Sequence, residues 1–123
     1  MNIAVYCAAS QSNCPAFDER TEELGKWMAQ KNHTLVYGGG NTGLMGVIAT
    51  SVMNAGGQVI GVMPQFFVDR EIAKKDITKL HIVETMSERK NKMIELSEVY
   101  IALPGGPGTL EEIAEGKISV LEK

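Results

Sequence analysis

Two glycine-rich segments, each placed between an apolar run and a helical pattern, constrain the fold of this chain more than any other feature. Residues 38–43 follow an apolar run and precede an apolar helical pattern at 44–55. Residues 104–109 follow the run 99–103 and precede a helical pattern that we expect to extend over 110–121. Runs that are apolar throughout, without polar alternation, are typical of strands covered on both faces. The repeated order of strand, glycine segment and helix therefore predicts parallel strands joined by crossover helices.

The rest of the chain continues this alternation of strands and helices. We expect strands at 3–8, 34–37, 58–63, 80–84 and 99–103 and helices at 18–31, 44–55, 88–96 and 110–121. Ser87 is the expected N-cap of the third helix, and residues 64–79 have the pattern of a mixed loop. Phe17, Leu24, Trp27 and Met28 are expected to form the apolar face of the first helix. The fold class we predict is α/β, a parallel sheet with helices on both faces, in a single domain over 1–123.

Charge and composition exclude several classes of function. The 123 residues include 12 basic and 15 acidic side chains, and a mildly acidic chain without a basic block is not expected to bind nucleic acid. No apolar run approaches the ~18 residues of a membrane span, and the first residues lack the basic region of a signal peptide. The two cysteines and two histidines have no metal-ligand spacing, so we expect no metal and no cofactor. We therefore expect a cytoplasmic protein with reduced thiols and no membrane partner.

The first glycine segment matches G-x-G-x-x-G at Gly38, Gly40 and Gly43. Dinucleotide binding would require an acidic residue at the end of the next strand, and residues 60–64 contain none. Two interpretations remain: the glycines only permit a tight turn and close packing, or the loop and the following helix N-terminus contact a phosphate or ribose. We favour the second, with substrate contacts from Gly39, Gly40, Thr42 and Gly43.

The second glycine segment is the more specific of the two. Its glycines allow backbone N–H groups to converge on an anion at a helix N-terminus, and Thr109 adds a hydroxyl. It is not a Walker A loop, because no G-K-[ST] follows at the required spacing. Glu111 and Glu112 come next, where a carboxylate would repel a bound phosphate. Favourable charge in a first helical turn explains them in part, but we expect a chemical role for at least one.

Two cations lie where a helix dipole disfavours them. Arg89 and Lys90 fall in the first turn of the helix expected at 88–96, and such a local conflict points to function. An arginine there could bind phosphate or orient a carboxylate. Taken alone, a solvated charged face would be the better interpretation.

Residues 86–93 and 104–112 together resemble the paired M-x-x-R-K-x-x-M and P-G-G-x-G-T-x-x-E motifs of the Lonely Guy family. Residues 37–46 and 69–72 are also similar to this family, whose members are cytokinin riboside 5'-monophosphate phosphoribohydrolases long mislabelled as lysine decarboxylases. The resemblance extends through residue 114. It implies a Rossmann-like nucleotide-binding domain, a homodimer, and hydrolysis of a purine nucleoside 5'-monophosphate, N6-prenylated or not, to free base and ribose 5-phosphate.

The resemblance also implies roles for individual residues. Arg89 and Glu112 would be the catalytic pair, and Glu112 can stabilise the positive charge that develops at C1' or activate water. Lysine decarboxylation lacks support, because the sequence has no pyridoxal-binding context. The phosphate would be held by Gly105, Gly106, Gly108 and Thr109, with Glu71, Lys90 and Glu111 as further substrate contacts.

The segment after residue 115 no longer resembles the family, whose members usually continue with another strand and more helices. We therefore expect this chain to lack the family's C-terminal part. Two alternatives to the enzyme stay open: a non-catalytic binder or carrier of a phosphorylated nucleotide-like ligand on the same fold, and an inactive fragment. The sequence does not identify the base.

Overall fold

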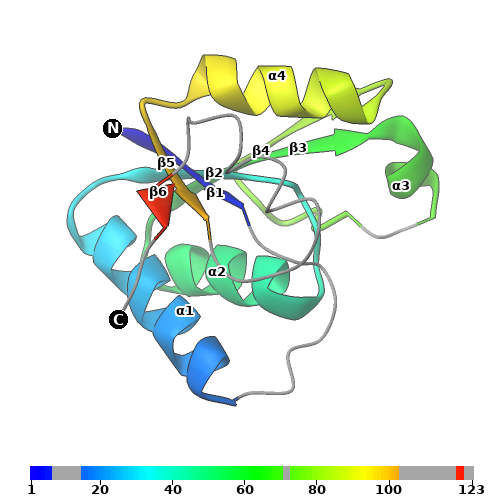
Figure 1. The fold of residues 1–123 in the computed structure, drawn as a ribbon. Coiled ribbons are helices and arrows are strands. Elements are labelled where there is room, and N and C mark those ends of the chain that lie inside the picture. Colours follow the sequence, from blue (N-terminus) through cyan, green and yellow to red (C-terminus); the bar gives the residue numbers. More distant parts are fainter. Residues whose placement is uncertain (7–14, 71–72, 103–118, 121–123) are drawn as a thin grey trace.

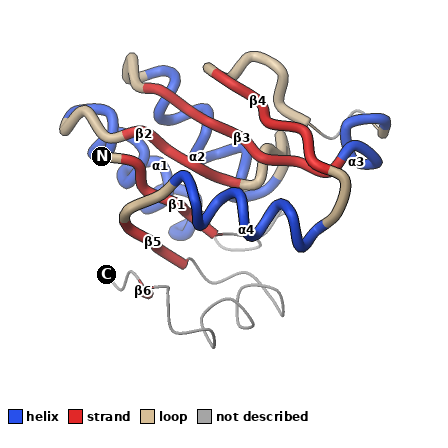
Figure 2. The backbone as a smooth tube through the Cα atoms, turned by 90° about the horizontal axis from the view of Figure 1, so that it is seen from above, coloured by secondary structure: helices blue, strands red, loops and turns tan. Residues whose placement is uncertain are grey.

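The computed structural model describes residues 1–6, 15–70, 73–102 and 119–120. Its centre is a six-stranded sheet with the strand order β4-β3-β2-β1-β5-β6, in which every neighbouring pair is parallel (Figure 2). The strands are β1 (Asn2–Tyr6), β2 (Thr34–Tyr37), β3 (Gln58–Pro64), β4 (Lys79–Val83), β5 (Val99–Ala102) and β6 (Ser119–Val120). The parallel sheet predicted from the apolar runs is confirmed.

Helices cover both faces of this sheet, as predicted (Figure 1). They are α1 (Pro15–Gln30), α2 (Gly43–Asn54), α3 (Gln65–Asp69) and α4 (Met86–Leu96). The chain builds β1 to β4 in one direction and then returns to place β5 beside β1. Because crossovers between parallel strands are right-handed, the reversal in direction puts α4 on the face opposite to α1 and α2. The order changes direction between β1 and β5, and ligands of such sheets bind near that point, at the carboxyl ends of the strands.

Each face of the sheet buries its own hydrophobic cluster. Alternate residues of β1 divide between them, because successive side chains of a strand point to opposite faces. Ile3 and Val5 pack with Met28 of α1 and the apolar side of α2, whereas Ala4 and Tyr6 lie with Met93 of α4. The two clusters fix the helices on the sheet and hold the carboxyl ends of the strands in place.

The apolar face predicted for α1 is wrong at one position. Leu24 and Met28 are buried as expected, but Trp27 is 44% exposed. Its ring lies against the His33 imidazole with the ring centroids 5.3 Å apart. Because a helix turns about 100° per residue, Trp27 points about 100° away from its buried neighbour Met28 and lies at the edge of the buried face of α1. The side chain of Phe17 lies outside the described residues.

The start of α4 differs from the prediction. The helix begins at Met86, and its N-cap is Thr85, two residues before Ser87. The Thr85 hydroxyl oxygen accepts a hydrogen bond from the backbone N–H of Glu88 at 3.1 Å. The Glu88 carboxylate in turn accepts one from the backbone N–H of Glu84 at 2.8 Å. This exchange resembles a capping box, which satisfies backbone donors that a helix N-terminus leaves without partners.

Two further segments depart from the predicted pattern. Residues 65–69 form α3, inside the stretch predicted as a mixed loop. Residues 119–120 form β6 beside β5, so the helix predicted over 110–121 is wrong there; residues 110–118 lie outside the described residues. At 119–120 the pairing with β5 overrides the local helical preference. No helix in the part of the chain that the structure describes is long and apolar enough to cross a membrane.

Candidate functional site

Arg89 is anchored across the carboxyl ends of β2 and β3. It lies in the first turn of α4 and is half-buried. Its Nε–H donates to the carbonyl oxygen of Val62 at 3.0 Å, and its Nη2 donates to the carbonyl oxygen of Gly38. Its Nη1 contacts the sulfur of Met86 at 3.7 Å. The cation that conflicts with the α4 dipole is therefore directed at two strand-end carbonyls, where its charge is favourable.

The close approach of the Arg89 guanidinium explains why position 38 is a glycine. A Cβ atom built there would collide with the Arg89 guanidinium and would lie 2.9 Å from Cε of Met45. Gly46 has a comparable role, since a Cβ there would lie 2.5 Å from the carbonyl oxygen of Asn41. Gly38 thus serves close packing, which was one of the two interpretations of the first glycine segment, and Gly46 does the same beyond that segment.

Gly39, Gly40, Thr42 and Gly43 form the turn from β2 into α2. Gly39 and Gly43 have φ values of 84° and 59°, which side chains rarely adopt. Thr42 is the exposed N-cap residue of α2, in an extended conformation and without a side-chain capping bond. The turn therefore presents the N-terminus of a 12-residue helix close to the end of β2. Such an N-terminus favours negative charge.

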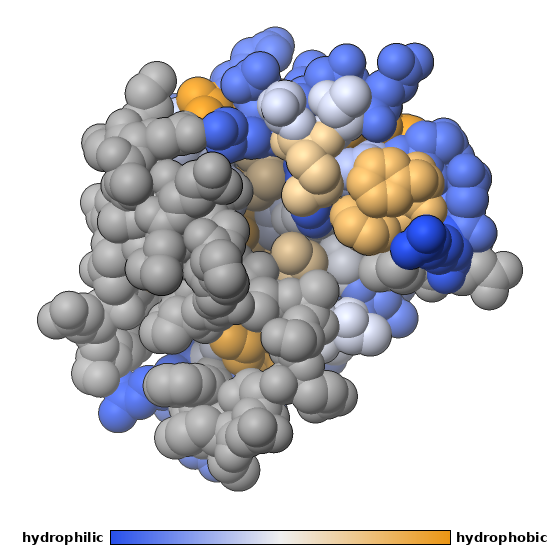
Figure 3. Space-filling view, turned by 45° about the vertical axis from the view of Figure 1, so that its right-hand side comes forward, coloured by the Kyte–Doolittle hydropathy of each residue, from blue (hydrophilic) through white to orange (hydrophobic). Residues whose placement is uncertain are grey.

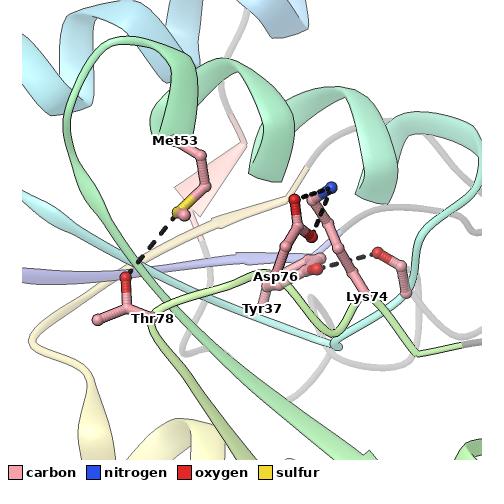
Figure 4. A network of polar contacts seen from close by, with 6 residues as sticks. Tyr37, Met53, Lys74, Asp76 and Thr78 are labelled. Atoms are coloured by element: carbon pink, nitrogen blue, oxygen red, sulfur yellow. Dashed lines mark hydrogen bonds and ion pairs between the residues drawn. The ribbon is translucent and has the colours of Figure 1, made fainter.

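Residues 73–74 hold positions 39–40 of this loop from the α2 side of the sheet. The backbone N–H of Lys74 donates to the carbonyl oxygen of Gly39 at 2.9 Å, and Ala73 forms an antiparallel bridge with Gly40. The buried Tyr37 hydroxyl donates to the carbonyl oxygen of Gly40 at 2.9 Å (Figure 4). Three consecutive carbonyls, at positions 38 to 40, thus accept hydrogen bonds from three different donors.

Lys74 combines a buried position with a charge. The residue is only 8% exposed, and its ammonium lies 3.0 Å from the nearer carboxylate oxygen of Asp76. The hydrogen bond from Lys74 holds the pKa of the Asp76 carboxyl below its usual value. Sequence reasoning missed both Lys74 and Tyr37. Nothing in the sequence distinguishes Lys74 from the exposed Lys75 beside it, and Tyr37 has the pattern of an ordinary strand residue.

The structure brings together only some of the predicted site residues. Arg89 contacts the glycine segment directly, and Lys90 follows it on α4, half-buried. The other predicted residues lie outside the described part of the chain: Glu71, Gly105, Gly106, Gly108, Thr109, Glu111 and Glu112. Among the described residues, no group of three or more His, Cys, Asp or Glu side chains could hold a metal ion. The absence of a cofactor stays a prediction.

Hydrophobic side chains gather on one surface of the molecule, near α3 and the start of α4 (Figure 3). The rings of Phe66 and Phe67 have centroids 4.4 Å apart, and Phe66 is 44% exposed. Met86, which contacts the Arg89 guanidinium, is also half-exposed. A separate groove of about 670 Å³ is lined by residues of α1 and α2 and includes Thr42 and Gly43.

The sheet order, the glycine turn after β2 and the arginine at the strand ends define a Rossmann-like α/β protein with its candidate site at the carboxyl edge. A family model described as "Possible lysine decarboxylase" matches residues 45–118. The chain belongs to this family, the Lonely Guy family.

Curated relatives carry enzyme names. The chain is 43% identical over 113 residues to a cytokinin riboside 5'-monophosphate phosphoribohydrolase of Arabidopsis thaliana, an alignment that covers 92% of this chain and 53% of the relative. It is also 43% identical to a probable enzyme of the same name from Oryza sativa subsp. japonica, over 92% of this chain and 45% of the relative. The chain thus spans about half the length of the curated relatives it matches.

Solved structures confirm the fold and add a different kind of relative. The molybdenum cofactor carrier protein of Chlamydomonas reinhardtii matches with a TM-score of 0.78 and 27% identity, over 97% of this chain and 74% of the carrier. The molybdenum cofactor binding protein of Rippkaea orientalis matches with a TM-score of 0.80 at 24% identity, over 97% of this chain and 73% of that protein, and supports the fold alone.

Proposed function

We propose that this chain is a phosphoribohydrolase that cleaves the N-glycosidic bond of a purine nucleoside 5'-monophosphate. The observation that carries the proposal is the Arg89 guanidinium, fixed at the ends of β2 and β3 against Gly38. Its place matches the arginine of the family motif, and the relatives that share about 40% of the sequence bear this enzyme's name. We further propose that the active form is a cytoplasmic homodimer.

The proposed roles follow from the chemistry of the bond. Cleavage develops positive charge at C1' of the ribose. The Glu112 carboxylate stabilises this charge or takes a proton from the attacking water. The water oxygen bonds to C1' as the bond from C1' to the base breaks, so the hydroxyl of the water stays on the ribose and its other proton ends, through the carboxylate or solvent, on the departing base. Arg89 orients the carboxylate or the phosphate through charge-assisted hydrogen bonds. Because its backbone anchors restrict its rotation, the guanidinium is already positioned before substrate binds.

Substrate binding is divided between the two glycine segments. In this proposal the second segment holds the 5'-phosphate through Gly105, Gly106, Gly108 and Thr109. The first segment and the N-terminus of α2 contact the ribose phosphate through Gly39, Gly40, Thr42 and Gly43. Glu71, Lys90 and Glu111 supply the remaining contacts. A phosphate held this way fixes the ribose against the catalytic pair. The substrate therefore loses its orientational freedom when it binds, and this loss no longer adds to the barrier of the chemical step.

The test is release of free base. The purified protein is incubated with AMP and with isopentenyladenosine monophosphate, and free base is separated by chromatography. We expect release by the wild type and a loss of about 100-fold or more in Glu112→Gln and Arg89→Ala, the range of general acid–base catalysis. Arg20→Ala, an exposed arginine of α1, is the matched control and keeps wild-type turnover. Unchanged turnover in both site variants would refute the assignment.

A non-catalytic carrier of a phosphorylated ligand is the second candidate. It is favoured by the similarity to the carrier protein of Chlamydomonas reinhardtii, which covers 97% of this chain. A carrier would retain one nucleotide per binding site through gel filtration and release no base. Base release from any nucleoside 5'-monophosphate would exclude it.

A further inference from the structure

The glycine segment after β2 is held by donors from both faces of the sheet. The Arg89 guanidinium reaches the carbonyl of Gly38 from α4, on one face. On the other face, the Tyr37 hydroxyl binds the carbonyl of Gly40, and the backbone N–H of Lys74 binds that of Gly39. The orientation of the acceptor that Arg89 uses is thus coupled to contacts on the opposite face.

We propose that the Tyr37 hydroxyl and the Lys74–Asp76 pair are positioning groups for Arg89, acting through the backbone of residues 38–40. The Tyr37 hydroxyl and the Lys74 backbone N–H bind the carbonyls of Gly40 and Gly39, next to the Gly38 carbonyl that the guanidinium binds. They set the direction of the Gly38 carbonyl, and this carbonyl with that of Val62 sets the orientation of Arg89. The inference rests on the proposed function for the role of Arg89 in turnover, but the positioning itself is independent of any reaction.

The glycines make such fixing necessary. Three consecutive glycines have many accessible backbone conformations, and Gly39 already adopts a φ of 84°. A segment of this kind does not hold a carbonyl in one direction by itself. Tyr37 is fully buried, so its hydroxyl needs an acceptor inside the protein, and the Gly40 carbonyl satisfies it. One buried hydroxyl thereby restricts the end of the loop.

The lysine restricts the middle of the same loop. Its backbone N–H can bind Gly39 only while residues 73–74 lie against the glycine segment. The buried Lys74 side chain holds this stretch in place, and its ammonium is neutralised by Asp76 at 3.0 Å. Because the Asp76 carboxylate is exposed, the aliphatic stem of Lys74 can be buried while its charged ammonium keeps a partner at the surface.

The test measures Arg89 directly. Hydrogen exchange of its Nε–H is followed by ¹⁵N NMR, with the resonance assigned by its loss in Arg89→Lys. Tyr37→Phe removes the hydroxyl and keeps the ring. We expect about tenfold faster exchange of this proton, the size expected for one buried hydrogen bond, and a similar fall in kcat for AMP with little change in KM. Lys74→Met is expected to act in the same direction.

Ser51→Ala is the matched control. It also removes one buried hydroxyl, which donates to the Glu22 carbonyl at 2.5 Å between α1 and α2, away from the loop. We expect it to lower the unfolding temperature and leave the Arg89 exchange rate and kcat unchanged.

The outcomes separate the two proposals. Wild-type exchange of the Arg89 Nε–H in folded Tyr37→Phe and Lys74→Met would overturn the positioning roles. If Tyr37→Phe does not fold, Lys74→Met alone decides the question. A wild type that releases no base would overturn the proposed function, while the exchange measurement would still decide whether Tyr37 and Lys74 position Arg89.

Discussion

Replacing Gly38 by alanine tests the close contact between the glycine segment and α4. Among the described glycines, those with positive φ are at positions 39, 43 and 56, so the backbone at 38 is open to alanine. The added methyl group would instead collide with the Arg89 guanidinium. The end of a flexible side chain can move aside, and this costs less than compressing the backbone. The substitution therefore displaces the guanidinium from the carbonyls of Gly38 and Val62.

The magnitude follows from those two acceptors. Removing a donor from a buried acceptor costs about 1–3 kcal/mol, and we expect a loss of this size in the free energy of unfolding. The assay is urea unfolding of Gly38→Ala in the wild-type and Arg89→Ala backgrounds. In the second background the guanidinium is absent, so the cost of the methyl group should fall by more than about 0.5 kcal/mol, the margin within which the effects of independent sites add.

The control is Gly56→Ala, at a turn with φ of 81° and no atom within 4 Å of the added Cβ. Its cost comes from backbone strain, about 1 kcal/mol, and should be equal in both backgrounds. Equal costs of Gly38→Ala in the two backgrounds would refute the reasoning, because the clash would then not involve Arg89.

Three further predictions concern capping and pH. Thr85→Ala should lower the free energy of unfolding by about 0.5–2 kcal/mol through loss of the α4 cap, whereas Ser87→Ala should change it by less than about 0.5 kcal/mol; thermal unfolding of both variants checks this. The hydrogen bond from Lys74 is the first cause of the lowered pKa of the Asp76 carboxyl. The ionised carboxylate therefore stabilises the folded state at pH values above the unfolded pKa near 3.8, and this stability is lost as pH falls through the lower folded pKa. Acid unfolding of Asp76→Asn should therefore be less steep in this window than that of the wild type. Burial lowers the pKa of the His81 imidazole below 6.5. Its NMR titration midpoint should therefore lie below 6.5, and the free energy of unfolding should decrease as pH falls from 6.5 through that midpoint. A midpoint above 6.5 would contradict this effect of burial.

The sheet could be predicted because its signal is local. Strands buried on both faces require uninterrupted apolar runs, and these occur in the sequence at the positions where β2 and β3 form. The dipole conflict of a cation in a first helical turn drew attention to Arg89, although taken alone it favoured a solvated face; the family resemblance singled the residue out, and its catalytic role stays a prediction. The prediction of Ser87 as the N-cap was wrong, although the sequence contains a signal for Thr85: Glu88 lies three residues after it, the spacing of a capping box, and Ser87 lacks such a partner.

The contacts around the glycine segment could not be predicted, because they join residues distant in sequence. Gly38 and Arg89 are 51 positions apart, and only the fold shows that the missing side chain of one makes room for the other. Lys74 lies in a stretch without periodicity, and its burial follows from the bridge between Ala73 and Gly40. The roles predicted for Glu71 and for the second glycine segment stay predictions.

The central position of β1 has a consequence for how the protein is made. Of the strands that the structure describes, β1 is the first to be synthesised, yet it pairs with β2 on one side and with β5, almost 100 residues later, on the other. Until β5 and α4 emerge, one edge of β1 lacks its partner and the side of the sheet carrying Ala4, Val36 and Val62 is uncovered. The helix that finally covers this side also brings Arg89. The candidate site therefore cannot form before α4 has emerged and packed on the sheet, so shorter nascent chains lack Arg89 at the strand ends.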